Sequence, residues 1–233
     1  MPYQYKYIQD ENFLTLSGGT TYIYAIIAGA QEFWKVYPPR NISGISSGIL
    51  SGAIAGVKGI DEAVSIINDI FPSDVFAFQP YDENGDFTIG AWMNILRDKP
   101  PVEQDIVKIV KSIISKQDHI DYVNNPLSPI VWTTLDDVVH AERVRVNLKN
   151  PNYNYETFLK IIEAGVAAPA LVKPIPIDLG FGQGTRLYAE GGAYDHLDGH
   201  LFIEDLKPKN VCAVFSRPKI WELPPMEKTG FFP

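Results

Sequence analysis

The chain has 233 residues, of which 45% are hydrophobic and 21% are charged, and this balance is that of a folded globular protein rather than of a disordered chain. Its formal net charge of -8 argues against sequence-independent binding to nucleic acid, and no polybasic block is present to attract anionic lipid. The length suits one hydrophobic core, so we expect a single domain over residues 1–233.

The N-terminal residues show no apolar stretch long enough for a secretory signal. The most apolar stretch, residues 22–36, is interrupted by polar residues and is shorter than the roughly 20 apolar residues that a spanning helix needs. Cys212 is the single cysteine and cannot form an internal disulfide, and its apolar surroundings predict a buried strand. We therefore expect a cytoplasmic protein.

Two strand–turn–helix units follow each other in the first quarter of the chain. Residues 13–19 (FLTLSGG) form a short apolar run that ends in two glycines, and the next fifteen residues carry apolar side chains at helical spacing. Residues 41–43 are a short extended stretch, GISSG (44–48) is a turn, and ILSGAIAGV (49–57) is a helix of small residues that can pack close to a sheet. Such units predict parallel strands joined by crossover helices.

The remaining chain adds elements of both kinds. Apolar spacing predicts helices over 59–71 and 102–116 as covers for the sheet, an amphipathic segment over 91–99, and a helix over 155–168, whereas residues 82–86 (DENGD) predict an exposed turn. Strands are expected at 129–134, 143–148, 186–192 and 210–216. The expected fold class is α/β, a single-domain three-layer sandwich with a mostly parallel sheet.

The GISSG run matches the GxSxG pattern of a nucleophile elbow, a sharp strand-to-helix turn that exposes a serine. The pattern alone is weak, because two glycines and a serine also recur by chance. Its context strengthens it, since a strand ends before Gly44 and a helix begins after Ser46. Ser46 would then lie at a helix N-terminus, where developing negative charge is stabilised.

A serine hydroxyl needs a base to accept its proton. Glu190 is the best placed carboxylate, because it ends an apolar strand and precedes two glycines; a polar strand end that faces water is the alternative interpretation. The four histidines stand in no strand-end motif and are interpreted as solvated or structural. Gly18 and Gly19 could present N–H groups to an oxyanion, or could simply close a strand-to-helix turn.

In this order, LSGG, GISSG and EGGA resemble the patatin-like phospholipase family, which has a glycine-rich oxyanion loop, an early GxSxG elbow and a late Asp-Gly-Gly motif. The stretch EAGVAAPALVKPIPID and the strand PIVWTTL resemble further parts of the family, so the resemblance covers roughly residues 13–196. The chain departs from the family pattern at Thr20 and Tyr22 in the first loop, and Glu190 stands where the family has Asp. Asp195, five residues later, is an alternative acid.

The resemblance implies a patatin-like fold and a lipid acyl hydrolase of the phospholipase A type that cleaves carboxyl esters of glycerophospholipids. Ser46 would be the nucleophile and Glu190 its base, while the N–H groups of Gly18, Gly19 and Thr20 would hold the oxyanion. No metal or other cofactor is implied. The expected partner is a phospholipid or another lipid ester, met in transient contact with a membrane surface.

Two other functions remain open. A Ser/His/acid esterase of the α/β-hydrolase type would need a histidine after the acid, and His196 and His200 follow Glu190 in that order. A catalytically inactive patatin-like module that binds or supports other molecules would explain the altered loop and the exchange of Asp for Glu.

Overall fold

The computed structural model describes residues 12–19, 23–70, 86, 88–97, 99, 105–193 and 198–215, and the structural statements below concern these residues. Its strands are β1 (Asn12–Leu16), β2 (Asn41–Gly44), β3 (Ile130–Asp137), β4 (Glu142–Asn147), β5 (Ile175–Asp178), β6 (Thr185–Glu190) and β7 (Asn210–Val214). Its helices are α1 (Ile23–Val36), α2 (Ser47–Lys58), α3 (Ile60–Asn68), α5 (Ile89–Ile95), α6 (Ile106–Ile113), α7 (Lys116–Asn124), α8 (Tyr155–Gly165), α9 (His200–Leu206) and the 3₁₀ turn η2 (Gly191–Ala193).

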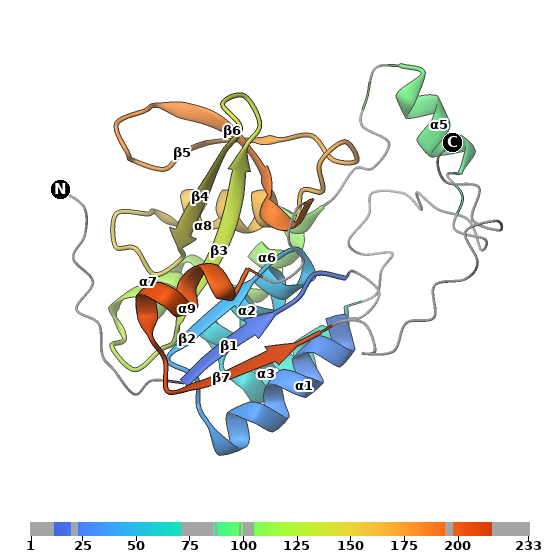
Figure 1. The fold of residues 1–233 in the computed structure, drawn as a ribbon. Helices are drawn as coiled ribbons and strands as arrows, with labels where there is room; N and C mark the ends of the chain where they lie inside the picture. The colour runs from blue at the N-terminus through green and yellow to red at the C-terminus, as the bar shows by residue number, and fades with distance from the viewer. Residues whose placement is uncertain are drawn as a thin grey trace.

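The seven described strands form one mixed sheet in the order β5-β6-β3-β2-β1-β7, with β4 paired to β3 as well (Figure 1). The neighbouring strands β7, β1, β2 and β3 are parallel. β4 and β6 are antiparallel to β3, and β5 is antiparallel to β6. Five of the seven described strands therefore point the same way, which confirms an α/β fold with a mostly parallel sheet.

α2 is the central helix and packs against β1, β2 and β3 on one face of the sheet. Residues 47–56 of this helix are all buried. A Cβ on Gly56 would lie 2.6 Å from Cγ2 of Val131, so the helix can approach the sheet this closely only because its residues are small. The prediction of a small-residue helix beside the sheet is confirmed.

The opposite face of the sheet carries α9 (Figure 1). Phe202 of α9 packs against Trp132 and Phe13, with ring centroids 5.5 and 6.4 Å apart. Side chains alternate along a strand, so Leu14 and Leu16 join the main core while Phe13 faces α9. Described helices thus lie on both faces of the sheet, but far more of them lie on the face that carries α2.

The structure corrects three details of the sequence interpretation. The helix expected over 102–116 ends at Ile113, because Ser115 and Asp118 form a capping box that starts α7. α3 and α6 pack on other helices rather than covering the sheet: α3 lies against α1 and α2, and α6 against α8. Cys212 is half-buried rather than buried, since β7 is the last of the described strands at its end of the sheet.

The amphipathic segment expected over 91–99 contains most of α5, which lies apart from the sheet (Figure 1). Ile89 at the start of α5 is 83% exposed, and Trp92 and Leu96 in the expected segment are 54% and 77% exposed. The turn expected over 82–86 falls outside the described residues except for Asp86, which is exposed. None of the described helices is long and apolar enough to cross a membrane.

We expect acid to destabilise the fold through His119, which is 4% exposed and whose ring centroid lies 4.7 Å from that of Phe158. Its Nε2 has no hydrogen-bond partner, and burial lowers the pKa of the imidazole. The folded state therefore binds the proton less readily than the unfolded state, whose pKa is 6.5. The stabilising contribution is complete above pH 6.5 and is lost as the pH falls below it.

The measurement is the free energy of unfolding in urea between pH 5 and 8 for the wild type and for His119→Phe. The phenylalanine variant should lose less stability on acidification, because it has no group to protonate. His200→Gln changes an exposed histidine and serves as the control. Equal acid sensitivity of wild type and His119→Phe would contradict the prediction.

Candidate active site

Ser46 lies on the sharp turn between β2 and α2, at the N-cap position of the helix. Its backbone has φ 54° and ψ -126°, a strained conformation for a residue with a side chain. The turn is tight enough to require glycine on both sides. A Cβ on Gly44 would lie 2.4 Å from the backbone of Gly48, and a Cβ on Gly48 would lie 2.4 Å from the carbonyl oxygen of Leu16. The GISSG run therefore has the geometry of a nucleophile elbow.

Strand pairing along β3 brings Glu190 close to Ser46. One edge of β3 pairs with β4 from Trp132 to Asp137, so β2 and β6 share the other edge. β2 pairs with the first part of β3, as far as Trp132, and β6 pairs antiparallel with the last part, where Glu190 is opposite Leu135. The carboxyl ends of β2 and β6 consequently point toward each other, and Ser46 and Glu190 follow or form those ends.

The Glu190 carboxyl is a partly buried acid with an unusual proton affinity. Burial raises its pKa to about 7, against the opposing effect of a hydrogen bond with the Ser46 side chain. Its Oε2 is buried and has no hydrogen-bond partner. A group with a pKa near 7 can both accept and return a proton at neutral pH, which is the property that general acid–base catalysis requires.

Two glycines follow Glu190 where the backbone passes close to neighbouring side chains. A Cβ on Gly192 would lie 3.6 Å from Oε1 of Glu190 and 2.6 Å from Cγ2 of Ile45, and one on Gly191 would lie 2.5 Å from Oγ1 of Thr134. The chain can turn this closely past Ile45 and Thr134 only without side chains at both positions.

Gly18 lies directly against Ser46, since a Cβ on Gly18 would be 3.1 Å from Cβ and 3.8 Å from Oγ of the serine. Gly19 has φ 140°, which favours glycine. The N–H of Ser46 donates to the carbonyl oxygen of Gly165 at 2.9 Å and is therefore occupied. Ser47 begins α2, where N–H groups have no partner within the helix. Neither Ser47 nor Gly165 was predicted as part of the site; the helix start just after Ser46 indicates Ser47, whereas no local sequence signal marks Gly165.

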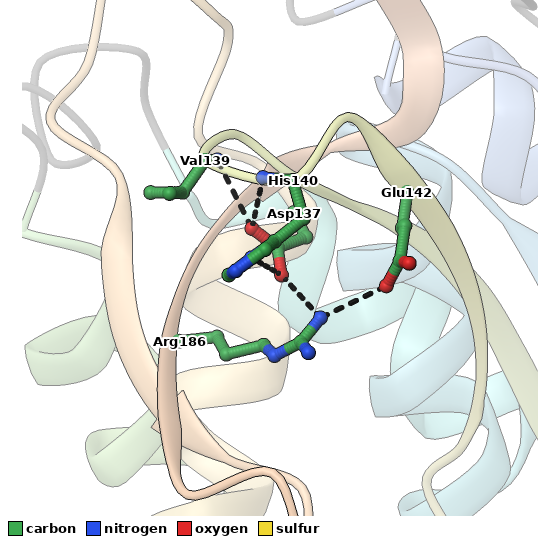
Figure 2. Close-up of polar contacts among 5 residues, drawn as sticks. All are labelled: Asp137, Val139, His140, Glu142 and Arg186. Atoms are coloured by element: carbon green, nitrogen blue, oxygen red, sulfur yellow. Dashed lines mark hydrogen bonds and ion pairs between the residues drawn. The ribbon is translucent and has the colours of Figure 1, made fainter.

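A charged cluster around the buried Asp137 holds the beginning of β6 against β3 and β4 (Figure 2). Asp137 accepts hydrogen bonds from the N–H groups of Val139 and His140, and it binds Arg186 at 2.8 Å, which also binds Glu142 at 2.9 Å. Burial alone would raise the pKa of Asp137, but the hydrogen bonds from His140, Val139 and Arg186 outweigh it and lower the pKa to about 2. Asp137 therefore stays ionised at neutral pH, and the bonds from Arg186 to Asp137 and Glu142 connect β6 with β3 and β4.

The described histidines do not contact Ser46 through any hydrogen bond in the structure. His119 is packed against Phe158, His140 binds Asp137 through Nδ1 at 2.8 Å, and His200 begins α9 and is exposed. Thr20, Asp195 and His196 lie outside the described residues. Within the described part of the chain, no group of three His, Cys, Asp or Glu side chains is arranged to hold a metal ion.

Comparisons with known proteins give a distant structural likeness. No family model and no curated protein sequence matches the chain. Among solved structures, VipD from Legionella pneumophila is similar with a TM-score of 0.43 and 13% identity, over 82% of this chain and 47% of that one. The chain thus spans about half the length of VipD. A likeness this loose carries no argument about activity.

Proposed function

We propose that the protein is a serine-dependent lipid acyl hydrolase of the patatin-like, phospholipase A type, which cleaves carboxyl esters of glycerophospholipids. The observation that carries the proposal is the meeting of a strained Ser46 with a partly buried Glu190 whose pKa is raised to about 7. The order of the LSGG, GISSG and EGGA motifs adds to it. We extend the proposal to a single patatin-like domain over the whole chain.

In the proposed reaction, Glu190 accepts the hydroxyl proton of Ser46 as Oγ attacks the ester carbonyl. The N–H groups of Gly18 and Gly19 stabilise the oxyanion, and Ser47 at the positive end of α2 is a further donor. The proton then passes to the leaving alcohol, and Glu190 activates the water that releases the fatty acid from Ser46. The exposed side chains of Ile89, Trp92 and Leu96 support transient contact with a membrane surface by a cytoplasmic enzyme.

The test is fatty-acid release from vesicles of mixed phosphatidylcholine and phosphatidylglycerol by the wild type and by Ser46→Ala. We expect release by the wild type and background release by the variant, together with fluorophosphonate labelling that also depends on Ser46. Labelling without release would indicate a serine hydrolase for another ester. Neither labelling nor release by the folded wild type would overturn the proposal in favour of an inactive module.

A further inference from the structure

Arg143 on β4 reaches across the sheet to the residue that follows the candidate base. Its NH2 group donates to the carbonyl oxygen of Gly191 at 2.9 Å. Its Nε donates to Oδ1 of Asp136 at 2.9 Å, and NH2 also donates to Oδ2 at 3.3 Å. A planar guanidinium held by two carboxylate contacts has a fixed orientation, so its bond to Gly191 is directed as well.

The register of the sheet explains this reach. Asp136 on β3 is opposite Arg143 on β4 and opposite Ala189 on β6, so the three residues lie in a row across three strands. Gly191 lies two residues beyond Ala189, on the same side. The Arg143 and Asp136 side chains are 28% and 18% exposed, which places the pair in a partly desolvated position rather than on the open surface.

We propose that Arg143, oriented by Asp136, is a positioning residue for Glu190. Hydrogen bonds fix the backbone before and after the Glu190 side chain. The N–H of Glu190 donates to the carbonyl oxygen of Ala167 at 3.1 Å, and the carbonyl oxygen of the following residue, Gly191, accepts from Arg143. Gly191 and Gly192 do not restrict their own backbone as other residues do, so an external bond is needed to fix the turn. The inference rests on the proposed function for its catalytic meaning.

Arg143 acts through geometry rather than through its charge. The causes of the raised pKa of Glu190 are burial and the Ser46 hydrogen bond, and Arg143 is not among them. Loss of the hydrogen bond from Arg143 to Gly191 should therefore change the pKa of Glu190 only by letting the carboxyl move toward water. That movement lowers the pKa of Glu190 toward 4.5. A displacement of about 1 Å at a reacting group can cost about 100-fold in rate.

The experiment compares Arg143→Met and Arg143→Lys with Arg145→Met. Arg145 is the matched control, because it lies on the same strand and face and also binds one carboxylate and one carbonyl, those of Asp205 and Leu201. Two measurements are made. One is kcat and KM for a soluble short-chain carboxyl ester, and the other is the titration midpoint of Glu190 by carbon-13 NMR, assigned from its absence in Glu190→Gln.

For Arg143→Met we expect kcat to fall about 10- to 100-fold with little change in KM. The titration midpoint of Glu190 should fall by about one unit or more. Arg143→Lys should lower kcat and the Glu190 midpoint less than Arg143→Met does. It replaces Arg143→Met in the test if that variant fails to fold. Arg145→Met should leave both unchanged.

An unchanged Glu190 midpoint in the folded Arg143 variants would overturn the proposal, and so would an equal effect of Arg145→Met. The NMR result does not depend on turnover. If the wild type hydrolyses no ester while the Glu190 midpoint still shifts in Arg143→Met, the positioning role stands and the proposed function fails.

Discussion

Replacing Glu190 by glutamine should abolish most ester hydrolysis and at the same time stabilise the protein at alkaline pH. A general base typically contributes about 10²- to 10⁴-fold, so we expect kcat to fall by that factor in Glu190→Gln. In the wild type, kcat/KM should rise with pH and reach half its maximum near pH 7, because the carboxylate is the active form and its pKa is about 7. Steady-state rates from pH 5 to 9 check both statements.

The stability change follows from the same pKa. The folded state keeps the Glu190 proton up to about pH 7, whereas the unfolded state, with a pKa of 4.5, releases it earlier. The stabilising contribution of the protonated carboxyl is therefore complete below pH 4.5 and is lost as the pH rises through 7. Glutamine cannot ionise, so at pH 8 the variant should be more stable than the wild type by on the order of 2 kcal/mol.

Glu163→Gln is the matched control for this experiment. Burial also raises the pKa of Glu163, which lies on α8 outside the proposed machinery. This variant should gain stability at alkaline pH and keep its activity. If Glu190→Gln kept full activity, the assignment of the base would be wrong, and Asp195 would be the next residue to test.

Replacing Ser46 by glycine should remove hydrolysis and raise the melting temperature above that of Ser46→Ala. The backbone conformation at φ 54° and ψ -126° is costly for any residue with a Cβ, so alanine keeps the strain and glycine relieves it. Glycine loses about 0.5–1 kcal/mol through its greater freedom in the unfolded chain, against a strain of about 1–3 kcal/mol.

The net gain should be about 1 kcal/mol, or about 2–4 °C in melting temperature for a chain of this size. Differential scanning calorimetry of Ser46→Gly beside Ser46→Ala measures it, and both variants lack the nucleophile, so activity plays no part in the comparison. A glycine variant no more stable than the alanine variant would show that the elbow stores no strain.

Local features of the site could be predicted from the sequence, because short-range rules govern them. Gly44 and Gly48 around Ser46 predict the turn, and the helix that begins after it is confirmed. The end of an apolar strand at Glu190 is equally local. The break between α6 and α7 could also have been predicted, since Ser115 and Asp118 have the spacing of a capping box.

Pairings between distant segments could not be predicted in the same way. The proximity of Ser46 and Glu190 depends on β6 running against the last part of β3, and no short pattern encodes that register. The contact between Arg143 and Gly191 depends on the pairing of β3 with both β4 and β6. The raised pKa of Glu190 follows from burial by those strands, so it too appears only in the folded structure.

The shared edge of β3 also affects when the site can form during synthesis. Ser46 emerges from the ribosome early, with β1, β2 and α2, whereas its proposed base Glu190 emerges only with β6, after β3 and β4. Until β6 pairs with β3, Ser46 in the nascent chain lacks its proposed base, Glu190. If the proposed function holds, a ribosome-bound fragment that ends before residue 185 should hydrolyse no ester, and activity should appear only after β6 has been synthesised.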